Sequence, residues 1–258
     1  MKIEELFSVR GKVALVTGGS RGIGEMIARA YVENGVKVYI TARKAEACDA
    51  LARELSKSGE CISIPGDISS LDEIDRLISE IEKHERKLDI LVNNAGASWG
   101  ADFQSFPENG WDKVMDLNVK SAFFMTQRAF KLLQAAGTKD DYARVINIGS
   151  IEGMRTSHLE AYSYAASKAA ILHVTRMMAK YLSRSYIAVN AIAPGYFPSK
   201  MTDSIPEEET GVIEEDTPMR RWGRPEDMAG VAIYLASRAS GFVCGSTMVV
   251  DGGLATTG

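Results

Sequence analysis

Three residues that could transfer a proton to or from a carbonyl group lie close together in the middle of the chain. Ser150 follows Asn147-Ile148-Gly149, Tyr164 lies 14 residues later, and Lys168 lies four residues after the tyrosine. On a helix, Tyr and Lys at this spacing share one face. A phenol can protonate a carbonyl oxygen, a neighbouring ammonium lowers the pKa of the phenol, and a serine hydroxyl can hydrogen-bond the same oxygen. Tyr162 is the weaker candidate acid, because alanine lies four residues after it.

A glycine-rich turn near the N-terminus could bind a dinucleotide. The residues after Thr17 read Gly-Gly-Ser-Arg-Gly-Ile-Gly, between a predicted strand and a predicted helix. Glycines permit positive φ and let a pyrophosphate approach the backbone, while the helix N-terminus supplies N–H donors. A lone glycine motif is weak evidence, but the strand before it and the helix after it are the setting that binding requires. We predict cofactor contacts here from Gly18, Ser20, Arg21, Gly22, Ile23 and Gly24.

Basic residues follow the second predicted strand. A site for NAD usually has an acidic residue there, ~20 residues beyond the glycines, to bind the ribose 2′-hydroxyl. This chain has Arg43 and Lys44 instead, and Arg21 lies in the glycine turn. Because guanidinium groups fit phosphate, Arg21 and Arg43 favour the 2′-phosphate of NADP(H). The alternative is that Arg43 and Lys44 are solvated residues at a helix start.

The elements that must position these residues alternate along the chain. Apolar runs predict strands covered on both faces, at residues 13–17, 36–41, 61–65, 90–92, 144–148, 187–192 and 248–250. Segments of helical period separate them, at residues 23–34, 45–58, 71–83, 111–136, 164–184 and 225–237. This order predicts an α/β fold: a single doubly wound Rossmann domain over residues 1–258, with a seven-stranded parallel sheet flanked by helices. Gly35 and Gly137 are placed to cap helices, and Pro225 to begin one.

Composition disfavours several classes of protein. The 258 residues are 45% hydrophobic and 25% charged, unlike disordered, collagen-like or membrane proteins. A net charge of −4 disfavours nucleic-acid binding. Three scattered cysteines indicate free thiols, and neither a signal peptide nor an apolar stretch of about 18 residues is found. No metal site is predicted from the spacing of His, Cys and acidic residues. We expect a cytoplasmic protein without a nucleic-acid or membrane partner.

Taken together, the motifs resemble the short-chain dehydrogenase/reductase family. The Thr-Gly-x-x-x-Gly-x-Gly turn, Asn-Asn-Ala-Gly at residues 93–96 and Tyr-Ala-Ala-Ser-Lys at residues 164–168 carry the resemblance, which covers nearly the whole chain. The resemblance implies an NADP(H)-dependent enzyme with the catalytic residues Asn118, Ser150, Tyr164 and Lys168. In the family pattern, Asn118 holds a water that links Lys168 to solvent, and Lys168 also binds the nicotinamide ribose.

The resemblance implies further cofactor contacts beyond the glycine turn. These are Asp67 and Ile68 at the adenine, Asn94, Ala95 and Gly96 at the adenosine ribose, Tyr164 and Lys168 at the nicotinamide ribose, and Pro194, Gly195, Phe197 and Ser199 around the nicotinamide. Two simpler interpretations stay open. Asp67 also suits the start of a helix, and the Pro-Gly segment also suits an ordinary turn after a strand.

Within the family, four segments resemble NADPH-dependent β-ketoacyl (3-oxoacyl) reductases of the rhamnolipid-synthesis type: residues 40–48, 93–100, 193–202 and 221–226. The resemblance implies a small carbonyl or alcohol substrate, in particular a 3-oxoacyl thioester carried on coenzyme A or acyl carrier protein. Residues 196–219 are expected to form a lid, with His158 at the pocket rim. The segment 134–141 is nearly neutral, which is unsuited to steering an acidic carrier.

Two other functions stay open: an NADP-dependent polyol or sugar-acid dehydrogenase, and a non-catalytic NADP-sensing protein. The complete set of candidate catalytic residues argues against the second. The family also implies a homotetramer. Its expected contact surfaces are the long helices that carry Phe123-Phe124-Met125 and Met177-Met178, and the last helix with the last strand.

Overall fold

Seven parallel strands form one sheet in the computed structural model, which describes residues 2–156, 160–203 and 207–255. They lie in the order β3-β2-β1-β4-β5-β6-β7. Their bounds are β1 Val13–Thr17, β2 Lys37–Thr41, β3 Cys61–Ser63, β4 Ile90–Asn93, β5 Ala143–Ile148, β6 Ile187–Pro194 and β7 Thr247–Val250. The predicted fold class is therefore confirmed. The strand order reverses between β1 and β4, and ligands of such sheets bind at the carboxyl ends beside that reversal.

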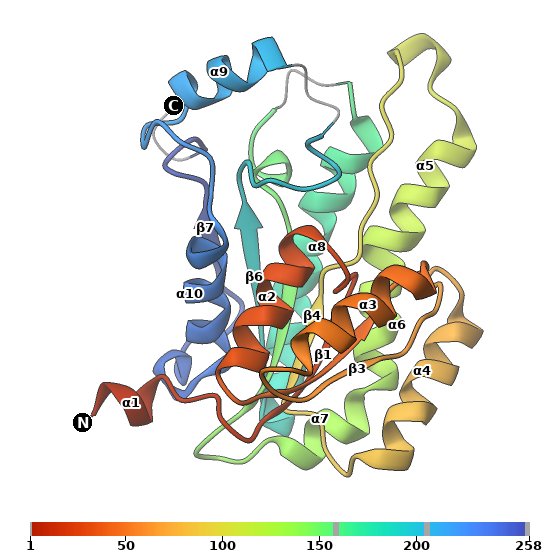
Figure 1. Ribbon diagram of the computed structural model, residues 1–258. Coiled ribbons are helices and arrows are strands. Elements are labelled where there is room, and N and C mark those ends of the chain that lie inside the picture. The colour runs from red at the N-terminus through yellow and green to blue at the C-terminus, as the bar shows by residue number, and fades with distance from the viewer. Residues whose placement is uncertain (1, 157–159, 204–206, 256–258) are drawn as a thin grey trace.

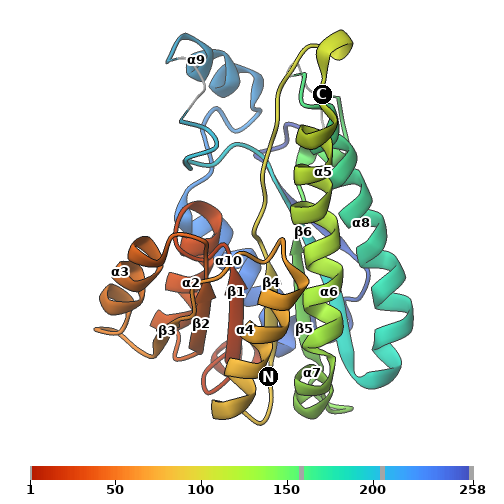
Figure 2. The ribbon, with the colours of Figure 1, turned by 90° about the vertical axis from the view of Figure 1, so that its right-hand side faces the viewer.

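Helices cover both faces of the sheet, as Figures 1 and 2 show. Apolar side chains of α2, α3 and α10 pack on one face, and those of α4, α6, α7 and α8 on the other. The bounds are α1 Ile3–Leu6, α2 Gly22–Glu33, α3 Ala45–Leu55, α4 Leu71–His84, α5 Glu108–Met115, α6 Ser121–Arg128, α7 Phe130–Ala136, α8 Tyr162–Leu182, α9 Glu207–Asp216 and α10 Pro225–Ala236. Burial on both sides explains why β1, β4, β5 and β6 are fully buried strands.

The carboxyl ends of the strands point to the end of the molecule where α9 lies, and the N-terminal helix α1 lies toward the opposite end (Figure 1). The predicted lid segment contains α9, which begins after the undescribed residues 204–206. No described helix is long and apolar enough to cross a membrane. The three cysteines are free, with Cys48 and Cys61 buried and Cys244 exposed.

The segment predicted as one helix over residues 111–136 is helical, but it is not one regular α-helix. The segment begins at Glu108 and is interrupted by a π-turn over Asp116–Lys120 and by a further break at Ala129. A π-turn places an extra residue in one turn, which re-aims the side chains around it. Here it lets the Asn118 amide reach the backbone of the loop after β4, at Ala97.

Gly35 and Gly137 both end helices, for different reasons. Gly35 has a φ of +78°, as expected of a glycine that follows a helix. Gly137 is instead extended, with a φ of −72°. A Cβ there would lie 2.2 Å from the Tyr186 carbonyl oxygen, so close approach of backbone, not a left-handed conformation, requires glycine.

Candidate active site

The glycine turn between β1 and α2 leaves backbone N–H groups available to a ligand. Gly18 and Gly22 have φ values of +63° and +55°, which favour glycine. A Cβ on Gly24 would lie 2.3 Å from the Gly18 carbonyl oxygen, so this position is closed to any side chain. No side chain caps the N-terminus of α2, which leaves its first N–H groups to a ligand. The backbone thus has the shape expected of the predicted dinucleotide cradle.

Asn94 and Thr17 hold the glycine turn in place. The Asn94 amide donates to the carbonyl oxygens of Thr17 and Gly18, at 2.9 and 3.1 Å. The Thr17 hydroxyl accepts from the backbone N–H groups of Asn94 and Ala95, at 3.0 and 3.1 Å. These bonds join the carboxyl ends of β1 and β4 at the point where the strand order reverses. The Asn94 side chain thus fixes the conformation of the glycine turn through its carbonyl groups.

The end of β2 lies beside the same turn. The Gly19 N–H donates to the Thr41 carbonyl oxygen at 3.3 Å, which places Arg43 two residues from that contact. Arg21 and Arg43 are both exposed, and neither guanidinium has a hydrogen bond or ion pair with another described residue. The Thr41 hydroxyl is buried without a partner among the described residues. Uncommitted guanidinium groups of this kind suit a phosphate.

The loop after β3 carries the residues predicted at the adenine. The Gly66 N–H donates to Ala42 at 3.1 Å, so this loop lies against the end of β2. The Asp67 carboxylate accepts from the backbone and the hydroxyl of Ser69, at 3.1 and 2.8 Å, and forms a turn before α4. Ile68 is buried in the core, so a ligand could meet only its backbone. Both interpretations of Asp67 are compatible with this geometry.

Ser150 and Tyr164 meet at the carboxyl end of β5. Burial is the largest influence on Tyr164 and raises its pKa to about 12, whereas the nearby Ser150 hydroxyl acts in the opposite direction. Ser150 also accepts from the Glu152 N–H at 3.1 Å, which fixes its hydroxyl at the start of the next turn. The two hydroxyls can together hold a carbonyl oxygen.

Lys168 lies beside this pair, in a dry environment. Its ammonium donates to the Ile148 carbonyl oxygen at 2.8 Å and lies 5.5 Å from the centre of the Tyr164 ring. Burial lowers the pKa of Lys168 to about 8. The expectation that Lys168 lowers the pKa of Tyr164 is wrong for this arrangement, because the ammonium is committed to Ile148 and burial dominates at the phenol.

Asn118 is buried and joins three elements. Its amide oxygen accepts from the Ala97 N–H at 2.8 Å, and its amide nitrogen donates to the Ala97 carbonyl at 2.9 Å. The same nitrogen donates to the Ser167 hydroxyl on α8 at 2.9 Å. A Cβ on Gly96 would lie 3.3 Å from the amide oxygen, which explains the glycine there. The side chain thus binds protein partners with both ends of its amide.

The turn after β6 reaches the glycine turn from the other side. A Cβ on Gly22 would lie only 3.1 Å from Ser199, so these distant predicted cofactor residues lie together. Gly195 lies against Asp251, which leaves no room for a Cβ. Phe197 is only 2% exposed, and its ring packs on Gly223. This ring belongs to the core, which leaves the surrounding backbone of Pro194–Ser199 as the surface toward a ligand.

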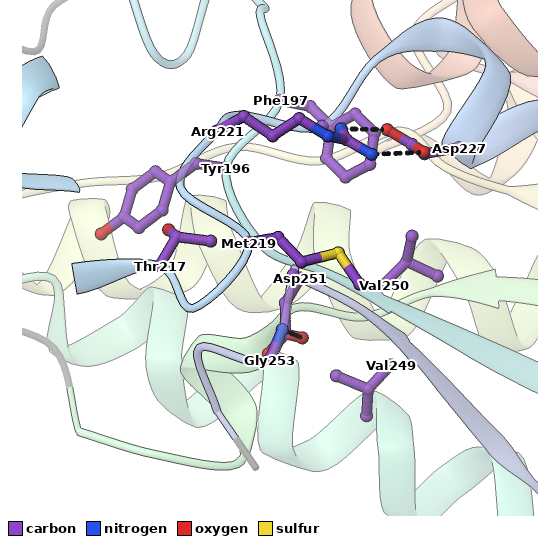
Figure 3. Close-up of a pocket in the computed structure, with 12 residues that line it drawn as sticks. Tyr196, Phe197, Thr217, Met219, Arg221, Asp227, Val249, Val250, Asp251 and Gly253 are labelled. Atoms are coloured by element: carbon purple, nitrogen blue, oxygen red, sulfur yellow. Dashed lines mark hydrogen bonds and ion pairs between the residues drawn. The ribbon is translucent and has the colours of Figure 1, made fainter. Parts of the chain in front are cut away.

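A cavity of about 410 Å³ lies between this turn, the segment after α9 and the end of β7. Figure 3 shows Tyr196, Thr217, Met219 and Val249 around it, with the Arg221–Asp227 pair along one wall. The guanidinium of Arg221 holds both carboxylate oxygens of Asp227, at 2.6 and 3.0 Å. The predicted rim residue His158 lies outside the described residues.

Comparison with known proteins identifies the family. A family model described as enoyl-(acyl carrier protein) reductase matches residues 18–255. The rhamnolipids biosynthesis 3-oxoacyl-[acyl-carrier-protein] reductase of Pseudomonas aeruginosa is 49% identical over 250 residues, which are 96% of this chain and 97% of that protein. The chain belongs to the short-chain dehydrogenase/reductase family. The predicted family and the predicted enzyme class, an oxidoreductase, are thereby confirmed.

Other members of the short-chain dehydrogenase/reductase family are similar over the same length. The solved Pseudomonas aeruginosa RhlG/NADP active-site complex has 47% sequence identity and a TM-score of 0.94, covering 97% of this chain and 99% of that chain. The 5-keto-D-gluconate 5-reductase of Escherichia coli is 35% identical over 255 residues, which are 98% of each protein. Relatives with acyl and sugar-acid substrates are therefore both present.

Sequence reasoning missed several contacts that short-chain dehydrogenase/reductase motifs bring together here. It did not identify the double acceptor role of the Thr17 hydroxyl or the link from Asn118 to Ser167. It also missed the bond from Lys168 to Ile148. The sequence shows a threonine at the end of the first strand and a serine before Lys168, and both have hydroxyl groups that can form hydrogen bonds. Only the three-dimensional arrangement reveals their partners.

Proposed function

We propose that this protein is an NADPH-dependent carbonyl reductase whose substrate is a 3-oxoacyl thioester. The observation that carries the proposal is the meeting of Ser150, Tyr164 and Lys168 at one end of the sheet. A half-buried phenol with a serine hydroxyl nearby can hold a carbonyl oxygen and give it a proton. A protein that only senses NADP has no need for this arrangement.

NADP(H) fits the cradle that this chain builds. A pyrophosphate would bind at the uncapped N-terminus of α2. The tight turn that directs this helix end toward the ligand needs glycine at Gly18 and Gly24, where a Cβ would clash with neighbouring atoms. Exposed Arg21 and Arg43 would hold the 2′-phosphate, because a guanidinium binds phosphate in a bidentate manner. Asp67 would lie at the adenine, and Ser199, beside Gly22, at the nicotinamide carboxamide. The NADP complex of the relative with 47% identity supports this choice of cofactor.

Each catalytic residue has a separate task in reduction. Bound NADPH supplies the hydride. Tyr164 keeps its proton at neutral pH because burial raises its pKa to about 12, so it stands ready as the acid. Ser150 donates a hydrogen bond to the carbonyl oxygen as negative charge develops there. Lys168, with its pKa lowered to about 8, can return a proton toward the phenol at physiological pH. Asn118 would keep the surrounding loop and helix in register.

Two observations support an acyl substrate. The relative with 49% identity is named for 3-oxoacyl reduction. The cavity beside the turn after β6 has apolar residues such as Met219, Val249 and Val250 in a mixed lining, and its charged groups are already paired: Arg221 with Asp227, and Asp251 with the backbone of Gly253 and Ala255. Such a lining favours an alkyl group over a polyhydroxylated acid, which needs several free polar partners.

The second candidate is reduction of a keto sugar acid, as in the relative with 35% identity. The charges on the surface also bear on whether the acyl group is carried by acyl carrier protein or by coenzyme A. The segment 134–141 is nearly neutral, and Arg128 on α6 binds Asp75 at 2.6 Å and lies over the Phe124 ring, so neither offers a free positive charge to an acidic carrier protein. This favours a coenzyme A thioester over one on acyl carrier protein.

The decisive experiment follows NADPH consumption with three kinds of substrate: 3-oxoacyl-coenzyme A esters, the same acyl groups on acyl carrier protein, and keto sugar acids. We expect turnover of the coenzyme A esters with a strong preference for NADPH over NADH. Turnover of keto sugar acids alone would replace the acyl proposal with the second candidate. A preference for the carrier-protein esters would contradict the inference drawn from Arg128.

We also propose a homotetramer. Phe123 and Met177 are 42% and 46% exposed on α6 and α8, while their neighbours Met125 and Met178 are buried in the core. Apolar side chains of this size on an outer helix face suit contact with another subunit. Light scattering after size-exclusion chromatography tests this, and a monomer would contradict it.

A further inference from the structure

A buried hydroxyl links the π-turn to the helix that carries the catalytic pair. The Ser167 hydroxyl accepts from the Asn118 amide at 2.9 Å and donates to the Tyr164 carbonyl oxygen at 2.7 Å. Ser167 has no exposed surface, and Asn118 is 4% exposed. Inside a protein such a chain of hydrogen bonds is stiff, because each buried donor that loses its acceptor is costly.

The other end of this link is equally fixed. Asn118 forms a pair of hydrogen bonds with the backbone of Ala97, at 2.8 and 2.9 Å. The loop after β4, the π-turn and the first turns of α8 are therefore joined through one amide and one hydroxyl. Ser167 is the point at which this assembly meets α8, directly before Lys168 and three residues after Tyr164.

We propose that Ser167 is a positioning residue for the Tyr164–Lys168 pair. Its hydroxyl holds the first turns of α8 against the π-turn, so that Tyr164 faces Ser150 while the Lys168 ammonium reaches the end of β5. A serine that bonds to a carbonyl three residues earlier also adjusts the local bend of its helix. The positioning role itself follows from these contacts. Only the expected effect on the reaction rate rests on the proposed function.

The chain contains a matched control for this arrangement. Two turns further along α8, the Thr175 hydroxyl accepts from the Asn147 amide at 2.8 Å and donates to the Ile171 carbonyl at 2.8 Å. Thr175 is as fully buried as Ser167. Both links join a buried amide to a buried hydroxyl on α8. The Ser167 hydroxyl donates to a carbonyl three residues back and the Thr175 hydroxyl to one four residues back, and only the first link contacts a residue of the catalytic pair.

The test compares Ser167→Ala with Thr175→Val in the full-length protein. Both variants lose one buried hydroxyl, so we expect similar losses of thermal stability. We expect kcat to fall about 10- to 100-fold in Ser167→Ala alone, since small displacements of catalytic groups have effects of this size. The NADPH dissociation constant should stay near the wild-type value in both. Ser167→Thr, which keeps the hydroxyl, should restore most of kcat.

A second readout needs no substrate. Lysine labelled with ¹³C at Cε reports the pKa of Lys168 by NMR, with Lys168→Met to assign the signal. We expect Ser167→Ala to move this pKa toward the ordinary lysine value of ~10.4, as the ammonium loses its dry position, and Thr175→Val to leave it in place. Equal effects of both variants on kcat and on this pKa would overturn the proposal. Wild-type protein that reduces no acyl thioester would overturn the proposed function instead, and the Lys168 titration would still decide the role of Ser167.

Discussion

The two halves of the sheet build their sites by different means. On the side of β1 to β4, the backbone forms the site: Gly18 and Gly22 adopt positive φ, Gly24 has no room for a Cβ, and Asn94 holds the turn from behind. On the side of β5 to β7, buried side chains form it, and burial alters their pKa values. If the proposed function holds, the backbone cradle should mainly set cofactor affinity and the titratable side chains should mainly set the rate.

The largest test of this contrast is Tyr164→Phe. Loss of the phenolic hydroxyl removes the acid, so we expect kcat to fall about 10²- to 10⁴-fold. NADPH affinity, measured by calorimetry, should change little, because the substitution keeps the aromatic ring in place and leaves the glycine turn unaltered. A variant that keeps wild-type turnover would exclude Tyr164 as the acid and reopen the choice of Tyr162. A large loss of NADPH affinity would break the separation between the halves.

A second test uses the pH dependence of folding stability. Unfolded Lys168 keeps its proton up to about pH 10.4, whereas burial in the folded protein lowers its pKa to about 8. The folded state is therefore penalised below pH 8, and the penalty disappears as the pH rises from 8 toward 10. Its size is about 3 kcal/mol, since each unit of pKa corresponds to about 1.4 kcal/mol.

Denaturant unfolding of wild type and Lys168→Met checks this expectation. The wild type should gain free energy of unfolding relative to the variant between pH 8 and pH 10, with the difference constant at lower pH. Lys113→Met is the control, because Lys113 is exposed and lies over the Trp99 ring. A parallel pH dependence in wild type and Lys168→Met would contradict a buried ammonium at this position.

The cradle half is tested by Arg43→Asp. Removing a charge-assisted bond to phosphate costs about 1.5–3 kcal/mol, so we expect the preference for NADPH over NADH to fall about 10- to 100-fold. The kcat with saturating NADPH should stay close to wild type, because Arg43 is remote from the reacting groups. Lys44→Asp provides a neighbouring change of the same charge. Equal effects of the two variants would indicate a general electrostatic influence and would remove Arg43 from the phosphate site.

The same contrast explains how much could be predicted from sequence. The glycine turn depends on glycines and on strand order, and both appear as local patterns, so its backbone shape could be predicted. The spacing also predicts that Ser150, Tyr164 and Lys168 lie at one end of the sheet, and their roles stay predictions. The direction of the Tyr164 pKa shift could not be predicted, since it depends on burial and on the bond from Lys168 to the Ile148 carbonyl. The π-turn over Asp116–Lys120 could not be predicted, because the apolar residues keep a helical period before and after it.

The smallest expected effect concerns the Arg221–Asp227 pair, where the segment after α9 returns to α10. Asp227 also accepts from the Arg224 N–H at 2.8 Å and so caps the helix. The Arg221 guanidinium is the main cause of its lowered pKa, followed by that N–H. A carboxyl group with a lowered pKa stabilises the fold above its unfolded pKa of ~3.9, and this stabilisation is lost as the pH falls through its folded pKa. Because both side chains are about one-third exposed, we expect Asp227→Asn to cost only about 1 kcal/mol at pH 7.

This loss should shrink below about pH 4, where the wild-type carboxylate also becomes neutral. Unfolding by urea at pH 7 and pH 3 measures it, with Glu226→Gln as the control on the exposed neighbouring residue. NADPH affinity should not change, because, among the described residues, the side chains of this pair bond only to each other and to the backbone of Trp222 and Arg224, and not to the glycine turn. An altered NADPH dissociation constant in Asp227→Asn would connect the two halves through the turn after β6, where Gly22 and Ser199 approach each other. NADPH binding at the glycine turn would then depend on side chains on the side of β5 to β7.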